Sequence, residues 1–182
     1  AMVKASTFKA LRWQPLGPTN VSGRMTDVAV VPPKGRSYTM YAASASGGLW
    51  KTENEGTTWE PVIETGPSTS IGDVAFAPSD SRIVWAGTGE ANIFRSSQSG
   101  AGILKSIDGG KTWRHMGLAG TNTIARIVVH PANPDLVYVA ASGHEWTFND
   151  DRGVYKSADG GKTWEKVLFV NDQTGAIDLV MD

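Results

Sequence analysis

The sequence contains no cysteine, and this absence removes several kinds of chemistry at once. None of its 182 residues is a cysteine, so a disulfide framework, a thiolate metal site and a cysteine nucleophile are excluded. The compartment stays open, because proteins without cysteine occur in oxidising as well as reducing compartments.

Strong net charge and long hydrophobic runs are missing as well. The formal net charge is −1 at pH 7, and the pI is near 6.3. These values give no electrostatic reason to expect a nucleic acid or an anionic membrane as partner. No apolar run approaches the ~18 residues that a membrane span needs. The first residues lack the basic and apolar regions of a signal peptide, and Ala1-Met2 is typical of a cloning remnant.

Several motifs of catalysis and cofactor binding are also missing. The Gly-Lys-Thr runs at 110–112 and 161–163 have Lys105 and Lys156 where a phosphate-binding loop needs its first glycine. The serine-hydrolase motif Gly-x-Ser-x-Gly does not occur. The three histidines, His115, His130 and His144, have no metal-ligand spacing. We therefore expect no cofactor and no metal.

Glycine, proline and tryptophan are plentiful, with 21, 9 and 7 residues. This composition favours short strands joined by turns over helices. An eight-residue motif occurs three times: Ser157–Trp164 is nearly a copy of Ser106–Trp113, and Thr52–Trp59 is a looser version. Its glycines supply the positive φ of a tight hairpin, and its Asp and Ser side chains accept backbone N–H bonds. Tryptophans at 59, 113 and 164 give intervals of 54 and 51 residues, a period that predicts a repeat fold.

Each repeat contains four short predicted strands in the same order, with turns that contain proline, asparagine and aspartate between them. The predicted first strands are Arg24–Val31, Ile71–Ala77 and Ile124–His130. The second strands are Tyr38–Ala43, Arg82–Ala86 and Leu136–Ala141, and the third are Gly48–Lys51, Gly102–Lys105 and Gly153–Lys156. The fourth begins at the tryptophan of each motif, and residues 8–16 resemble an outer strand that precedes its own blade.

This arrangement predicts an all-β fold, a β-propeller of four-stranded antiparallel blades. We expect a leader or tag remnant at 1–10 and a partial propeller at 11–182. Its blades lie at about 18–63, 68–118 and 121–170, and a further blade starts at 175–182. Three blades do not close a ring, which takes four to eight. The sequence is then either a truncated part of a longer protein, which we favour, or a chain that self-associates to complete the propeller.

The repeated pattern Ser-x-Asp-x-Gly-x-Thr-Trp resembles the Asp-box, or bacterial neuraminidase repeat, complete at 106–113 and 157–164. The whole chain from residue 11 is similar to the N-terminal part of long bacterial sortilin-like and glycosyl-hydrolase-like repeat proteins. Sialidases, xyloglucanases and sortilin ectodomains are relatives. The resemblance implies that the motif is structural and lies away from the ligand face. The residues concerned are Ser106, Asp108, Gly110, Trp113, Ser157, Asp159, Gly161 and Trp164.

The catalytic patterns of two related families are incomplete in this chain. The sialidase resemblance implies three arginines. Arg24 and Arg126 take two of the places, but Gly72-Asp73 stands at the third. The xyloglucanase resemblance implies a catalytic aspartate in the run that reads Tyr41–Gly48 here, and its position holds Ala45. Both departures argue against those activities, since an inverting pair needs two carboxylates.

The loops between the second and third strands, 87–101 and 142–152, are the candidate site, because long loops on a rigid scaffold carry function. They combine carboxylates with aromatics, a mixture typical of sugar sites. The candidate acid and base residues are Glu90, Glu145 and Asp150, and the candidate ligand-binding residues are Arg24, Asn92, Arg95, Arg126, His144 and Trp146. In the alternative interpretation, Glu90, Asn92 and Arg95 only hold their loop, and the aromatics seal the gap between blades.

Two functions remain open. One is a sortilin-like module that binds a carbohydrate or a peptide, with no nucleic-acid or membrane partner. The other is part of a glycoside hydrolase. The resemblance favours a secreted or periplasmic protein and leaves a cytoplasmic location open.

Overall fold

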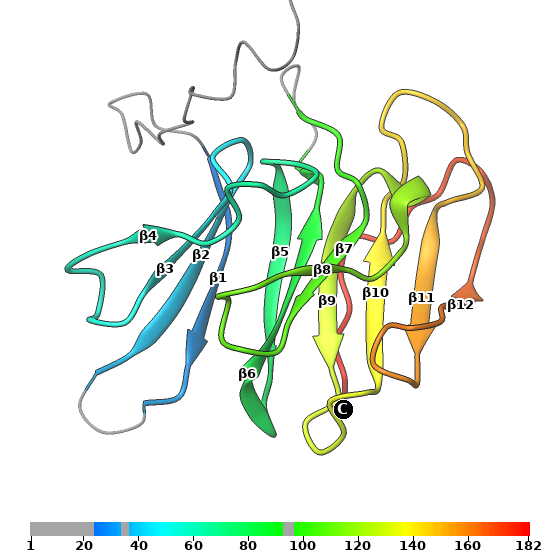
Figure 1. Ribbon diagram of the computed structural model, residues 1–182. Helices are drawn as coiled ribbons and strands as arrows, with labels where there is room; N and C mark the ends of the chain where they lie inside the picture. The colour runs from blue at the N-terminus through cyan, green and yellow to red at the C-terminus, as the bar shows by residue number, and fades with distance from the viewer. Residues whose placement is uncertain (1–23, 34–36, 93–96) are drawn as a thin grey trace, which may run out of the picture.

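The protein folds into three four-stranded antiparallel sheets that stand side by side (Figure 1). The computed structural model describes residues 24–33, 37–92 and 97–182. The first sheet contains β1 (Met25–Val31), β2 (Thr39–Ser44), β3 (Leu49–Thr52) and β4 (Glu60–Pro61). The second contains β5 (Ile71–Ala77), β6 (Asp80–Thr88), β7 (Ile103–Ser106) and β8 (Arg114–His115). The third contains β9 (Ile124–Val129), β10 (Val137–Ala141), β11 (Gly153–Ser157) and β12 (Glu165–Leu168).

Within each sheet every strand pairs with the next one along the chain, as in a propeller blade. A single turn of 3-10 helix, η2 (Ala119–Thr121), separates the second and third sheets. The prediction of an all-β partial propeller is therefore confirmed. None of the described helical segments is long and apolar enough to cross a membrane.

The hydrophobic core lies between the blades. One cluster joins the first and second blades and includes Tyr41, Leu49 and Val84. A second cluster joins the second and third blades around Trp85 and Ile124. The middle blade is covered on both faces, so β5 and β6 are buried along most of their length. This explains their near-continuous apolar sequence, since a strand covered on both faces does not alternate.

The predicted strands agree with the structure most closely in the inner positions, and β5 has the predicted bounds. The fourth strands begin one residue after each motif tryptophan, at Glu60, Arg114 and Glu165. Trp113 remains bonded to its own turn, because its indole N–H donates to the carbonyl of Gly110 at 3.1 Å, whereas the indole N–H of Trp164 donates to the carbonyl of Met116 at 2.7 Å.

Residues 175–182, predicted as a strand, form no strand in the structure. They run along the third blade, where the N–H of Ala176 donates to the carbonyl of Ala141. The strand predicted at 8–16 lies outside the described residues.

The three hairpins that carry the repeated motif share one hydrogen-bond pattern. In the second blade, the Ser106 hydroxyl accepts the N–H of Gly110 at 2.8 Å. The Asp108 carboxylate accepts the N–H and the hydroxyl of Thr112 at 2.9 and 2.6 Å. The third blade repeats these bonds with Ser157, Asp159, Gly161 and Thr163. In the first blade Thr52 and Asn54 take the same places. The hairpins lie at the lower end of the blades in Figure 1, opposite the long loops after β6 and β10.

Candidate ligand-binding site

The candidate site lies at the upper end of the blades, where β1 begins and where β6 and β10 end (Figure 1). Three charged side chains, one from each blade, lie near one another there: Arg24, Glu90 and Glu145. They come from positions 66 and 55 residues apart in the sequence. The propeller topology brings these positions together because equivalent strand ends of neighbouring blades are adjacent.

Arg24 and Glu90 form a bidentate ion pair between the first and second blades. Nε of Arg24 donates to one carboxylate oxygen at 2.7 Å, and Nη2 donates to the other at 2.5 Å. The Glu90 side chain is fully buried, whereas that of Arg24 is 43% exposed. The hydrogen bond to Glu90 is the main reason that the pKa of Arg24 is raised. Both carboxylate oxygens of Glu90 are thus engaged by a cation that still reaches solvent.

Glu145, from the third blade, has a different environment. Its side chain is partly buried, and its Oε1 is buried without a hydrogen-bond partner among the described residues. Burial raises the pKa of Glu145, and the negative charge of Glu90 raises it further. A buried carboxylate oxygen without a donor is unfavourable. Glu145 is therefore the group in this cluster that a ligand donor would stabilise.

The loop that carries Glu145 is held from inside by Arg152. The guanidinium donates to the backbone carbonyls of Ser142 at 2.7 Å, His144 at 2.5 Å and Thr147 at 3.1 Å. The Asn149 amide also donates to the carbonyl of Thr147, at 3.0 Å. These bonds hold the loop conformation, chiefly through its backbone carbonyls.

Two aromatic side chains project from this held loop. Trp146 and Phe148 are each 72% exposed, and His144 beside them is also exposed. Large apolar side chains displayed beside polar groups commonly mark a binding surface. In the alternative interpretation these aromatics seal a gap between blades. Within the three described blades, Trp146 and Phe148 are exposed and seal no such gap.

The remaining candidate residues are not joined to this cluster by any interaction that the structure describes. Asp150 is exposed, and it is its backbone carbonyl that accepts a hydrogen bond from Lys166. Asn92 is exposed and accepts a bond from Ser97 through its carbonyl. Arg95 lies outside the described residues. Arg126 is part of a separate ionic network on the inner strands.

That inner network connects successive blades. Asp27 of β1 accepts the N–H of Val74 in β5 at 3.2 Å, and Asp73 of β5 accepts the N–H of Ile127 in β9 at 2.7 Å. Burial and the neighbouring charge of Asp27 raise the pKa of Asp73 to about 7. β1 thus binds β5, and β5 binds β9, through an aspartate.

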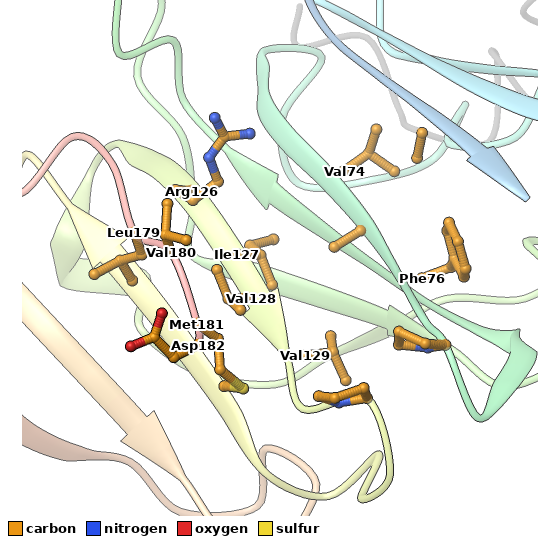
Figure 2. A pocket seen from close by; sticks show the side chains of 14 residues that line it. Val74, Phe76, Arg126, Ile127, Val128, Val129, Leu179, Val180, Met181 and Asp182 are labelled. Carbon is orange, nitrogen blue, oxygen red and sulfur yellow. The ribbon is translucent and has the colours of Figure 1, made fainter.

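Arg126 continues the same network. It donates to Asp73 at 3.4 Å and to Asp178, in the C-terminal segment, at 2.8 Å. It stands at the rim of a hollow of about 500 Å³ lined mainly by apolar residues of β5, β9 and the C-terminal segment. Figure 2 shows its guanidinium directed away from the apolar side chains of Val128 and Val129. Arg126 therefore has charged partners within the fold.

Sequence reasoning missed Arg152, Asn149, Asp27 and Asp73. The inner-strand aspartates did carry a signal, because Asp27-Val28, Asp73-Val74, Arg126-Ile127 and Asp178-Leu179 recur at one place in successive repeats. For Arg152, the sequence contains no signal other than its position before Gly153. Within 24–33, 37–92 and 97–182, no group of three or more His, Cys, Asp or Glu side chains could hold a metal ion.

Comparison with known proteins agrees with this architecture. The BNR/Asp-box repeat model matches residues 155–166. A xyloglucanase of Hypocrea jecorina (strain QM6a) is 30% identical over 141 residues, which are 70% of this chain and 16% of that protein. The chain thus spans about a sixth of the length of this relative.

Solved structures with the same fold include several GH74 enzymes. An ancestral GH74 enzyme superposes with a TM-score of 0.61 at 25% identity, covering 82% of this chain and 19% of its own. The GH74 enzyme of Niastella koreensis gives 0.62 at 19% identity, covering 79% and 22%. YCF48 bound to D1 peptide gives 0.58 at 17% identity, covering 90% and 47%. The chain resembles part of a GH74-type propeller.

Proposed function

Because the chain is a relative of the Asp-box (BNR repeat) β-propellers, we propose that its upper face is a glycan-binding surface, with a β-glucan of the xyloglucan type as ligand. The observation that carries this proposal is the pair Trp146 and Phe148, each 72% exposed on a loop held by Arg152. Aromatic faces stack on the C–H surfaces of sugar rings, and a rigid platform loses little entropy on binding.

The charged cluster beside the platform supports the same ligand class. Glu145 has an unpaired buried oxygen that can accept a hydrogen bond from a sugar hydroxyl, and the partly exposed Arg24 places a positive charge at the same surface. Sugar hydroxyls provide both donors and acceptors, so they satisfy such a mixed site. The relationship to a xyloglucanase supports a glycan over the peptide ligand of a sortilin-like module. Such a ligand is met outside the cytoplasm, so we propose a secreted or periplasmic location.

Glycoside hydrolysis is the second candidate, and Glu145 is the observation that favours it. A partly buried carboxyl with a raised pKa, beside a second carboxylate, has the features of a general acid. Ala45, which is 3% exposed, stands where the xyloglucanase resemblance implies an aspartate. We therefore propose glycan binding as the first candidate function and glycoside hydrolysis as the second.

A titration with xyloglucan oligosaccharides, followed by calorimetry and by product analysis, tests both candidates. Trp146→Ala is expected to weaken binding at least ~10-fold, about 1.4 kcal/mol, through loss of a stacking surface. Tyr38→Ala is the control, because Tyr38 is 44% exposed and precedes β2 at the opposite end of the blade. Equal affinities for Trp146→Ala and the unmodified protein would contradict the proposed surface.

The same samples separate binding from catalysis. Binding without new reducing ends supports the module, whereas product formation that Glu145→Gln abolishes supports the hydrolase. If neither xyloglucan nor other β-glucans bind, while an extended peptide does, the glycan proposal is wrong.

A further inference from the structure

At the hairpin end of the sheets, each blade carries the same pair of side chains, an aromatic residue and a lysine. Tyr41, Trp85 and Tyr138 stand at equivalent positions of the second strands, directly opposite Lys51, Lys105 and Lys156 on the third strands. In each pair the ammonium group lies over the ring, 5.8, 4.7 and 5.8 Å from its centroid. This repetition identifies three copies of one aromatic–lysine pair.

The first copy receives the hairpin of the second blade. Tyr41 is 1% exposed, and its hydroxyl donates to the carbonyl of Gly109 at 2.9 Å. A Cβ on Gly110 would lie 3.2 Å from the Tyr41 ring. Burial raises the pKa of Tyr41 to about 12, with smaller contributions from nearby carboxylates. The Gly-Gly of the motif thus lets the hairpin backbone approach the ring.

The second copy receives the hairpin of the third blade in the same manner. Trp85 is fully buried, and a Cβ on Gly161 would lie 2.6 Å from its ring. The indole of Trp164 packs edge-on against it at 6.2 Å. The ammonium of Lys105 donates to the carbonyl of Gly160 at 2.9 Å. This bond is equivalent to the one from the Tyr41 hydroxyl to Gly109 in the first copy.

The third copy has no hairpin. Tyr138 is only partly buried, and its hydroxyl has no hydrogen-bond partner among the described residues. It lines a hollow of about 410 Å³ together with His130, Leu136 and residues 179–182. The hollow occupies the place that a following blade fills in the first two copies.

A second, independent observation concerns the far wall of this hollow. Asp178 stands in the C-terminal segment at the place of Asp27, Asp73 and Arg126, and it binds Arg126 at 2.8 Å. In the first two contacts an aspartate accepts a backbone N–H of the next blade, whereas here the Arg126 side chain donates to the carboxylate of Asp178. Residues 175–182 therefore take the inner position of a fourth blade.

We propose that Tyr138 and Lys156 form the docking site for the Asp-box hairpin of a fourth blade, whose inner strand is residues 175–182. The hairpin places consecutive glycines on the Tyr138 ring and a backbone carbonyl at its hydroxyl. The occupant is a continuation of the same polypeptide rather than a second copy, because residues 175–182 already fill the position that β1 of another copy would need.

Tyrosine nitration followed by mass spectrometry tests this assignment. It compares the 182-residue chain with the natural protein that contains it. Tyr41 is expected to be protected in both, whereas Tyr138 is expected to react in the short chain and to be protected in the longer one. Equal reactivity of Tyr138 in both, or a natural protein that ends at Asp182, would overturn the proposal. Protection that grows with the concentration of the short chain would identify a second copy instead and would equally overturn it.

Paired hydroxyl deletions provide a second readout. Tyr41→Phe is expected to lower the melting temperature of both proteins, because it removes the bond to Gly109. Tyr138→Phe is expected to lower it only in the longer protein. A Tyr138→Phe variant that is neutral in both contradicts the predicted hydrogen bond.

Discussion

At the scale of single residues, the Asp-box aspartate acts as an internal cap for its own turn. Asp108 accepts the N–H groups of Lys111 and Thr112 and the Thr112 hydroxyl. These bonds, chiefly those from Thr112, hold the pKa of Asp108 well below its usual range. In the first blade a side-chain amide caps the turn in the same way, because Asn54 Oδ1 accepts the N–H of Thr58 at 2.9 Å.

Replacement of Asp108 should therefore distinguish hydrogen bonding from charge. Asp108→Ala is expected to destabilise the protein by on the order of 1 kcal/mol, as loss of a helix N-cap aspartate does. Asp108→Asn is expected to keep most of the stability, because it recreates the turn of the first blade. Urea unfolding at pH 7 measures both. Equal destabilisation by the two variants would mean that the charge, and not the acceptor, matters.

At the scale of secondary-structure elements, the loop between β10 and β11 depends on one guanidinium. Arg152 binds three carbonyls of this loop from a position next to Gly153, where β11 begins. A lysine has the charge but not the planar fork that reaches several carbonyls at once. The aromatic platform at Trp146 thus depends on Arg152 for its shape.

Arg152→Lys is expected to loosen the loop while the sheets stay intact. Amide hydrogen exchange should accelerate at least ~10-fold within residues 142–152 but not in β10 or β11, because local opening costs less than global unfolding. Arg114→Lys is the matched control, since Arg114 is exposed on β8. Unchanged exchange in the loop would show that Arg152 does not hold it.

At the scale of the whole molecule, the blades are joined by buried carboxylates on the inner strands. Asp73 has a side chain only 4% exposed, and its pKa is raised to about 7 by burial and by Asp27. The folded protein therefore favours protonated Asp73. The stability from this group is fully present below the unfolded pKa of ~3.9 and is lost as the pH rises toward 7.

Asp73→Asn is expected to remove this pH dependence. The amide oxygen still accepts the N–H of Ile127, and the amide group has no charge to bury. Thermal unfolding between pH 4 and 8 should show a smaller decline in melting temperature for the variant than for the unmodified protein. Parallel pH profiles would contradict the role of Asp73. The control is Asp80→Asn, since Asp80 pairs with Arg82 near the surface.

The blade fold follows from the sequence alone, because tight turns require glycine and aspartate locally and the turn motif recurs at intervals of 54 and 51 residues. The sequence likewise determined that the loops after β6 and β10 carry the polar and aromatic candidates. Which of these residues meet follows from the packing of the blades and not from the sequence. Arg24, Glu90 and Glu145 come from three blades, so their proximity depends on how the sheets stack. The position of Arg126 in its repeat predicts a ligand-binding residue, whereas the packed blades pair it with Asp73 and Asp178. The recurrence of these positions in successive repeats marks them as equivalent, but it does not name their partners, since the docking of whole blades sets which side chains meet.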